Sequence, residues 1–143
     1  MSDIRVLLVC AGNTCRSPMA GGLLDELLQR RDVEAEVRTA GLSPGGRVNP
    51  HAVAVMKDIG IDISHHTPKR ITKELVEWAT YIVPMTRELG ADLVDSFPEA
   101  SRKMRWLEKD VDDPVSEQTA SRYCETRDQL RTVLTVLAEE LKK

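Results

Sequence analysis

A cysteine and an arginine, separated by five residues, are the side chains of this sequence best placed to do chemistry together. Cys10 ends a short apolar run, and Arg16 is followed by Ser17 and Pro18, which are typical of a helix start. A loop of this length can turn its N–H groups inward, and with the helix N-terminus they form an anion site. Arg16 adds a planar guanidinium that can hold two phosphate oxygens. The spacing therefore predicts a phosphate-binding loop.

The residues of this loop suggest a nucleophile as well as a binding site. The predicted phosphate-binding residues are Ala11, Gly12, Asn13, Thr14, Cys15, Arg16 and Ser17. The dipoles that hold phosphate would also favour the thiolate of Cys10, which lies at the base of the loop. Ser17 can donate its hydroxyl to that sulfur and help it leave again. Asn13 suits a bracing role, because its side chain can satisfy backbone groups and it tolerates left-handed φ. We predict phosphoryl transfer to Cys10; the alternative is an inert buried thiol.

A phosphoryl transfer of this kind needs a general acid for the leaving group, and Asp113 is our candidate. It stands in the sequence Asp112-Asp113-Pro114. Proline restrains the residue before it to an extended conformation, which can aim the side chain of Asp113 over the loop. In the second half-reaction the same carboxylate would act as base on the attacking water. The alternative interpretation is a common surface turn.

The rest of the sequence alternates between strand-like and helix-like segments. Apolar or alternating runs predict strands over residues 4–9, 34–40, 81–83 and 103–107. Helical spacing predicts helices from residue 17 onward, over 51–59, within 68–77, over 87–94 and in a long C-terminal segment. This order favours an α/β fold with a mostly parallel sheet and helices on both faces. Ligands of such sheets bind beyond the carboxyl ends of the strands, where the loop 10–16 is expected.

Length and composition set further limits. The 143 residues suit one domain, residues 1–143, whose core needs neither a metal nor a disulfide. A net charge of −3 offers no basic face for nucleic acid, and no segment resembles a membrane span or a signal peptide. The odd number of cysteines fits a reducing compartment, so we expect a cytoplasmic protein. We also expect a monomer without cofactor or metal, since the histidines lack ligand spacing.

Residues 10–18, together with 113–114, resemble the low-molecular-weight protein tyrosine phosphatase family. The similarity runs along the whole chain and includes residues 51–53, 61–66 and 123–130. The resemblance implies a four-stranded parallel sheet flanked by helices, in a three-layer fold. It also implies a phosphocysteine intermediate on Cys10, phosphorylated protein substrates and no metal.

The same resemblance assigns roles outside the loop. It implies that Asp113 is the acid and base, and that His66 belongs to a network that braces Asn13. The chain departs from the family in one respect: an aromatic residue usually follows the Asp-Pro pair and forms a wall of the substrate cleft, whereas Val115 and Ser116 stand here. The missing aromatic weakens the case for phosphotyrosine, whose ring would be stacked.

Thr14 bears on the substrate. Tyrosine phosphatases of the family usually carry a larger aliphatic residue there, and the protein arginine phosphatase branch resembles this chain more closely over residues 12–16, 85–86 and 123–128. A threonine hydroxyl can contact the guanidinium of phosphoarginine, whereas an aliphatic side chain would leave N–H groups unpaired, at about 1–3 kcal/mol each. Asp113 can pair with the cationic guanidinium. The predicted activity is phosphoarginine hydrolysis, with phosphotyrosine as the alternative substrate.

The same loop could also serve other functions. A thioredoxin-coupled arsenate reductase shares the loop, but its chemistry needs two further cysteines, and only Cys124 lies outside the loop. A phosphate-binding module or a redox sensor built on Cys10 and Cys15 would not need Asp113. Cys15 itself is either the partner of Cys10 in a reversible disulfide or a small packed residue.

Overall fold

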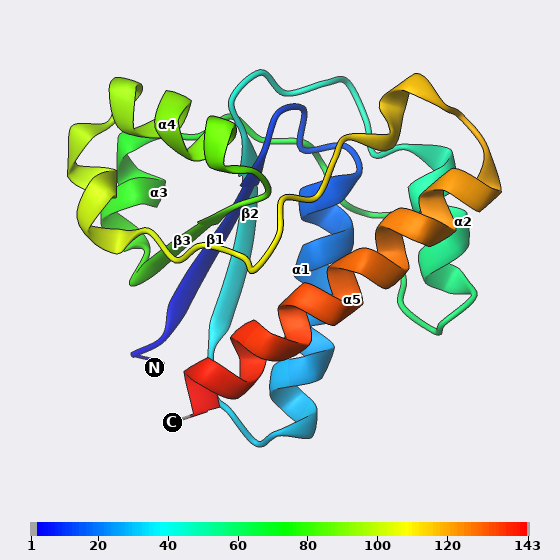
Figure 1. Cartoon of the computed structure of the whole chain (residues 1–143), viewed down its shortest axis with the longest axis horizontal. Coiled ribbons are helices and arrows are strands. Elements are labelled where there is room, and N and C mark those ends of the chain that lie inside the picture. Colours follow the sequence, from blue (N-terminus) through cyan, green and yellow to red (C-terminus); the bar gives the residue numbers. More distant parts are fainter. Residues whose placement is uncertain (1–2, 143) are drawn as a thin grey trace.

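The computed structural model describes residues 3–142 as a parallel sheet between two layers of helices (Figure 1). Its strands are β1 (Arg5–Cys10), β2 (Glu36–Gly41) and β3 (Tyr81–Pro84), in the order β2-β1-β3. Both neighbours run parallel to β1, which is central and buried. The predicted α/β class, with a parallel sheet and helices on both faces, is confirmed. The carboxyl end of β1 delivers Cys10 to the edge of the sheet.

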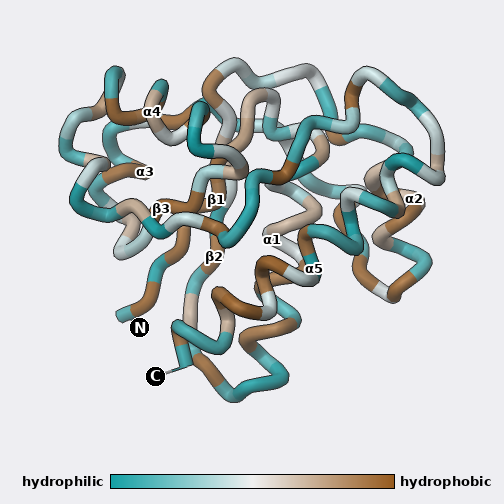
Figure 2. Tube along the Cα trace, in the orientation of Figure 1, coloured by the Kyte–Doolittle hydropathy of each residue, from teal (hydrophilic) through white to brown (hydrophobic). Residues whose placement is uncertain are grey.

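The helices divide between the two faces of the sheet. One face carries α1 (Arg16–Arg30), α2 (Pro50–Lys57) and α5 (Ala120–Lys142), and the other carries α3 (Lys73–Trp78) and α4 (Arg87–Ser96). A hydrophobic core lies on each face of the sheet, and alternate side chains of β1 pack into one or the other, because successive residues of a strand point to opposite faces. Leu8 joins the core beneath α1 and α5, and Leu7 joins the core beneath α3 and α4. Figure 2 shows the hydrophobic residues along these strands and on the inner sides of the helices.

The predicted fourth strand over residues 103–107 is wrong. Residues 3–142 form three strands, and the segment contributes a single parallel bridge between Met104 and Ile82. It follows a 3₁₀ helix (Pro98–Lys103) and leaves the sheet after Arg105 N donates to Ile82 O at 2.9 Å. The side chains beyond the bridge take other partners. The guanidinium of Arg105 lies 4.7 Å from the Tyr81 ring centre, and that of Arg87 lies 4.9 Å from the Trp106 ring centre.

The predicted start of the first helix needs a correction as well. Ser17 was expected to cap the helix and Pro18 to occupy its first position, but α1 begins at Arg16 and its N-cap is Cys15. The amide of Met19 donates to the carbonyl of Cys15 at 3.0 Å, which places Ser17 inside the first turn. Pro18 is tolerated there because the first amides of a helix have no intrahelical acceptor. The hydroxyl of Ser17 is thereby released from capping and turned toward the loop.

Candidate active site

The loop between β1 and α1 is held from outside by its carbonyl groups. Four of them accept hydrogen bonds from backbone amides of residues 42–49. The amide of Leu42 donates to the carbonyl of Cys10, and in the same way Ser43 donates to Ala11, Gly45 to Gly12 and Asn49 to Thr14, at 2.8–3.1 Å. In a trans peptide the amide points away from the carbonyl, so these bonds direct the following N–H groups inward. The loop therefore has the form of an anion-binding cup, lined by amides and closed by the N-terminus of α1.

This close fit depends on Gly41 at the end of β2. A Cβ atom at this position would lie 2.8 Å from the carbonyl oxygen of Ala11 and 2.9 Å from the amide of Asn13. Both contacts are with backbone that cannot move aside without opening the loop. Glycine at this position lets the 42–49 segment approach the cup.

The sulfur of Cys10 lies at the base of the cup, and the residue is 1% exposed. The sulfur accepts a hydrogen bond from the amide of Asn13 at 3.1 Å, and the hydroxyl of Ser17 lies 2.9 Å away. Both groups can donate a hydrogen bond to the sulfur. The structure thus brings three residues of the predicted site into contact.

Asn13 has a left-handed φ of 54°, a conformation that asparagine tolerates, and its side chain links the cup to the 66–69 segment. The amide of Lys69, which can only donate, lies 2.9 Å from Asn13 Oδ1 and thereby fixes the orientation of the side-chain amide. Asn13 Nδ2 then donates to Ser17 Oγ at 2.6 Å and to Thr39 Oγ1 at 3.0 Å. Because Ser17 accepts this bond, its own hydrogen is free to point at the sulfur of Cys10.

His66 completes the support behind Asn13. Its Nε2 lies 3.0 Å from the backbone oxygen of Asn13 and 3.1 Å from Oδ1. Both are acceptors, so Nε2 carries a proton and donates. Burial lowers the pKa of His66; the hydrogen bond to Asn13 raises it in part and the charge of Lys69 lowers it, so that the net shift is downward. A neutral imidazole with its proton on Nε2 is therefore the form that braces the loop at neutral pH.

Arg16 presents an unsatisfied donor to the cup. The residue is 4% exposed; Nη1 donates to the carbonyl of Val111 at 2.9 Å and Nη2 lies 3.4 Å from Asp113 Oδ2. Its Nε is buried and has no hydrogen-bond partner within the described chain. A buried donor without a partner costs free energy, and a phosphate oxygen in the cup would satisfy it.

Asp113 lies at the rim, where the predicted acid is needed. Its side chain is 37% exposed and caps a short 3₁₀ helix (Pro114–Ser116), with Oδ1 accepting from Val115 N at 3.0 Å. The thiol of Cys15 lies 3.8 Å from the same oxygen. Burial, followed by the charges of Asp113 and Cys10, raises the pKa of Cys15 to about 12. Cys15 is thus a protonated thiol beside Asp113.

Thr14 occupies a fixed place between two glycines. A Cβ on Gly12 would lie 3.3 Å from Thr14 Oγ1, and one on Gly45 would lie 2.8 Å from Thr14 Cγ2. The methyl group therefore faces Gly45 and the hydroxyl faces Gly12. Within residues 3–142 the hydroxyl of Thr14 takes part in no hydrogen bond, so it is available to a ligand.

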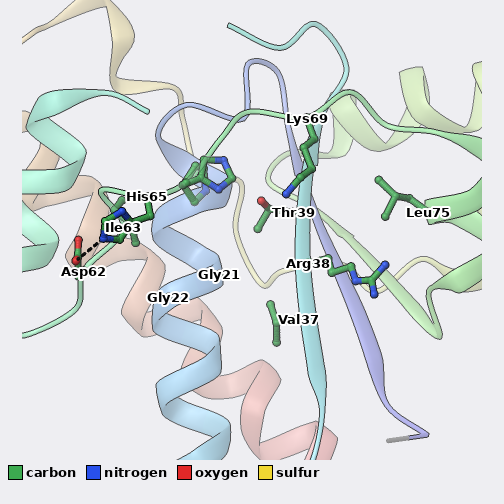
Figure 3. A pocket seen from close by; sticks show the side chains of 12 residues that line it. Gly21, Gly22, Val37, Arg38, Thr39, Asp62, Ile63, His65, Lys69 and Leu75 are labelled. Carbon is green, nitrogen blue, oxygen red and sulfur yellow. Dashed lines mark ion pairs between the residues drawn. The ribbon is translucent and has the colours of Figure 1, made fainter. Parts of the chain in front are cut away.

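A cavity lies behind the cup, along β2 and α1 (Figure 3). Its wall includes Thr39, His66 and Lys69, whose contacts with Asn13 are described above. Asp62 and His65 form an ion pair at its margin, at 3.7 Å. The described residues contain no group of three or more His, Cys, Asp and Glu side chains that could hold a metal ion. Likewise, no helix in residues 3–142 is long and apolar enough to cross a membrane.

Sequence reasoning missed the parts of the site that act through their backbone. The 42–49 segment supplies four amides to the cup, and Lys69 supplies the amide that orients Asn13. The identities of those side chains carry no signal for such contacts. The glycines of residues 41–46 were the available hint, because they mark a close approach between segments.

Comparison with known proteins places this site in a family. The family model "Low molecular weight phosphotyrosine protein phosphatase" matches residues 5–143. A protein-arginine-phosphatase from Geobacillus stearothermophilus is 36% identical over 147 residues, covering 96% of each chain. Arsenate reductase 1 from Staphylococcus epidermidis is 31% identical over 141 residues, covering 99% of this chain and 100% of the other.

A solved structure matches the whole fold. The structure of the YwlE arginine phosphatase, in a cysteine-to-serine mutant with a phosphorylated active-site serine, superposes with a TM-score of 0.93. It is 32% identical to this chain and covers 98% of it, with 97% of its own length matched. The fold and the order of elements are thus shared over nearly every residue.

Proposed function

Because this chain belongs to the low molecular weight phosphotyrosine protein phosphatase family, we propose that it hydrolyses phosphoarginine on proteins through a phosphocysteine at Cys10. Cys10 is the nucleophile, Arg16 holds the phosphoryl group, and Asp113 transfers the proton. Ser17, Asn13 and the more distant His66 position the sulfur and the loop. No step calls for a metal or a cofactor.

In the first step the thiolate of Cys10 attacks phosphorus, and a sulfur–phosphorus bond forms as the phosphorus–nitrogen bond breaks. The electron pair stays on the guanidine nitrogen, which takes a proton from Asp113. The inward amides and Arg16 hold the equatorial oxygens, where charge is spread in the transition state. Asp113 lies 3.4 Å from Arg16, so the acid and the phosphate clamp meet at one rim of the cup.

In the second step water attacks the phosphorus of phosphocysteine. Asp113, now a carboxylate, takes a proton from this water, and the sulfur–phosphorus bond breaks with the electron pair returning to Cys10. The hydroxyl of Ser17 and the amide of Asn13 receive that charge, at 2.9 Å and 3.1 Å from the sulfur. Inorganic phosphate then leaves, and the enzyme returns to its starting state.

The buried Nε of Arg16 is the observation that carries the proposal. Each of its two terminal nitrogens has a protein partner for one of its two hydrogens, whereas Nε has none within the described residues. Arg16 ends the same loop that begins at Cys10, and an anion with several oxygens could accept hydrogen bonds from the guanidinium and from the inward amides together. A phosphoryl group meets that requirement while presenting phosphorus to the sulfur.

Phosphoarginine is favoured over phosphotyrosine by the rim of the cup. The unpaired hydroxyl of Thr14 and the carboxyl group of Asp113 suit a polar, cationic guanidinium, because each has an oxygen that can accept a hydrogen bond from its N–H groups. Val115 stands where a wall for a phenyl ring would be expected, and it is 58% exposed. The protein-arginine-phosphatase from Geobacillus stearothermophilus, at 36% identity, supports the same choice.

Arsenate reduction is the second candidate, on the strength of the 31% identical reductase. Cys10, Cys15 and Cys124 are all free, and Cys124 is half-buried in α5. A relay to thioredoxin needs two cysteines beyond the nucleophile. The thiol of Cys15, with a pKa near 12, is a poor attacking group for such a relay. Free cysteines also fit a monomer that works in the cytoplasm, which forms part of the proposal.

The decisive experiment compares kcat/KM for phosphoarginine and phosphotyrosine peptides of one sequence, with Cys10→Ser as the control. We expect phosphoarginine to be preferred by tenfold or more, which corresponds to about 1.4 kcal/mol in the transition state. A preference for phosphotyrosine would keep the mechanism and reject the substrate. Full activity in Cys10→Ser, or no activity on either peptide, would reject the phosphatase and leave a binding module.

A further inference from the structure

We propose that Gln118 is a positioning residue for the general acid: its side-chain amide joins the segment that carries Asp113 to the segment that shapes the cup. The inference rests on the proposed function, since it concerns the proton transfer by Asp113. Gln118 belongs to the turn before α5 and touches neither Cys10 nor Arg16. Its effect would come entirely through the groups that it holds.

The side chain of Gln118 uses its hydrogen-bonding capacity on three partners. Its Nε2 donates to the backbone oxygen of Val115 at 2.9 Å and to the hydroxyl of Tyr123 at 2.9 Å. Its Oε1 accepts from Asn49 Nδ2 at 3.1 Å. A solvent-exposed glutamine ordinarily bonds to water. Three protein partners on separate segments indicate a structural link.

Val115 relays this link to the acid. Its carbonyl accepts from Gln118, and its amide donates to Asp113 Oδ1 at 3.0 Å. The backbone of Val115 therefore accepts a hydrogen bond from Gln118 through its carbonyl group and donates one to the side chain of Asp113 through its amide. Without the side chain of Gln118, the turn that positions Asp113 would no longer be linked by hydrogen bonds to Asn49 and Tyr123.

Asn49 relays the link to the cup. Its amide donates to the carbonyl of Thr14 at 2.8 Å, and its Oδ1 caps α2 by accepting from the amide of His51 at 2.8 Å. Its side-chain Nδ2 donates to Gln118 Oε1. A continuous path of hydrogen bonds thus runs from Thr14 through Asn49 and Gln118 to the turn of Asp113.

Tyr123 gives the path a rigid base. The residue is fully buried in α5, and its ring lies 5.4 Å from that of His51, measured between centres. Its hydroxyl is therefore a fixed acceptor for Gln118. Because Gln118 is bonded to this fixed hydroxyl, it can set the position of the 113–116 turn relative to the cup, whereas a hydrogen bond to water could not.

A series of aryl phosphates with leaving groups of decreasing acidity tests the inference. General acid catalysis contributes roughly 10²–10⁴ and matters most for the poorest leaving group. In Gln118→Ala we expect kcat/KM to fall about tenfold for the poorest leaving group and less than threefold for the best, so that the dependence on leaving-group pKa steepens. Asp113→Asn should show the same change in a stronger form.

Gln29→Ala is the matched control, because Gln29 is an exposed glutamine whose side chain bonds, within residues 3–142, to Asp25 alone, one turn away in α1. It should leave the leaving-group dependence unchanged. A uniform loss across the series in Gln118→Ala, or none, would overturn the inference. Gln118→Glu keeps the length and the acceptor for Asn49 but loses both donors, so it should behave like Gln118→Ala.

Hydrogen exchange gives a readout that needs no activity. In Gln118→Ala the amide of Val115, which donates to Asp113, should exchange at least several-fold faster than in the wild type, while Gln29→Ala leaves it unchanged. Unchanged exchange in Gln118→Ala would refute the link even if the protein proved not to be a phosphatase. Inactivity of the wild type on every substrate, with faster exchange in the variant, would reject the proposed function and keep the link.

Discussion

The hydroxyl oxygen of Ser17 lies 2.9 Å from the sulfur of Cys10, inside the first turn of α1. Asn13 Nδ2 donates to that oxygen at 2.6 Å, so the hydrogen of Ser17 is left for the sulfur. In the proposed reaction, this hydrogen bond would stabilise the negative charge that the sulfur regains when its bond to phosphorus breaks. We therefore expect Ser17 to contribute most to the second step.

Replacing Ser17 by alanine should therefore slow the hydrolysis of phosphocysteine more than its formation. A hydrogen bond to a charged group is worth about 1.5–3 kcal/mol, so we expect kcat to fall about tenfold to a hundredfold. Rapid-quench kinetics should show a burst of leaving-group release equal to the enzyme concentration. A lower kcat without a burst would place Ser17 in the first step instead.

Gly45 should influence substrate preference through Thr14. A methyl group in Gly45→Ala would meet Thr14 Cγ2 at 2.8 Å and push the hydroxyl from its place. We expect the ratio of kcat/KM for phosphoarginine and phosphotyrosine peptides to fall several-fold, since one polar contact is worth about 1–3 kcal/mol. Gly46→Ala is the matched control, because nothing lies within 4 Å of its added methyl group. Equal ratios in the two variants would show that Thr14 keeps its hydroxyl in place without Gly45.

The stability of the protein should depend on the neutral form of His66. Burial lowers its pKa from the usual value of 6.5, so the unfolded chain binds the proton more readily than the folded one. This contribution is present above pH 6.5 and is lost as the pH falls through the folded pKa. We expect the free energy of unfolding in urea to fall less between pH 7 and pH 5 in His66→Gln than in the wild type.

The control for His66 is His65→Gln, because the side chain of His65 is almost fully exposed and, among the described residues, pairs with Asp62 alone. It should reproduce the pH dependence of the wild type. Glutamine at position 66 can still donate an amide hydrogen to Asn13, so the loop keeps its support while the titrating group is removed. Identical pH dependence in all three proteins would mean that His66 does not couple to folding.

Cys15 should resist alkylation. With a pKa near 12, its thiolate fraction at pH 8 is on the order of a thousandfold below that of an ordinary cysteine, whose pKa is about 8.5. Peptide mapping after treatment with iodoacetamide should find Cys15 unmodified when a cysteine peptide in the same tube has fully reacted. Modification at comparable rates would contradict this. Any disulfide between Cys10 and Cys15 would then have to begin with oxidation of Cys10.

The residues of the candidate site could be selected from the sequence because their types and spacing are chemically specific. Cys10, Arg16 and Ser17 lie within one short segment, and the helix in it begins two residues before the expected first position at Pro18. The choice of Ser17 as a cap failed because local propensity favours serine at that position, while the hydroxyl is engaged by Cys10 and Asn13. Tertiary contacts outweighed the local preference.

The scaffold was harder to predict because it is built from backbone groups. The segment 42–49 holds the cup through amides that any residue except proline would supply, and Lys69 acts through its amide too. The strand expected at 103–107 failed for a related reason. An apolar segment can join a sheet edge through one bridge, here at Met104, when its other side chains find partners elsewhere.

The outward-facing carbonyl groups of the cup couple ligand binding to folding. Each amide of the 42–49 segment lies more than thirty residues along the chain from the carbonyl that it binds. The anion site therefore forms only once β2 has joined the sheet. Phosphate therefore binds the native state and finds no equivalent in the unfolded chain. By mass action it adds about 2.7 kcal/mol of stability at a hundred times its Kd. In a cell rich in phosphate, the product of the proposed reaction would also act as a folding ligand for its own enzyme.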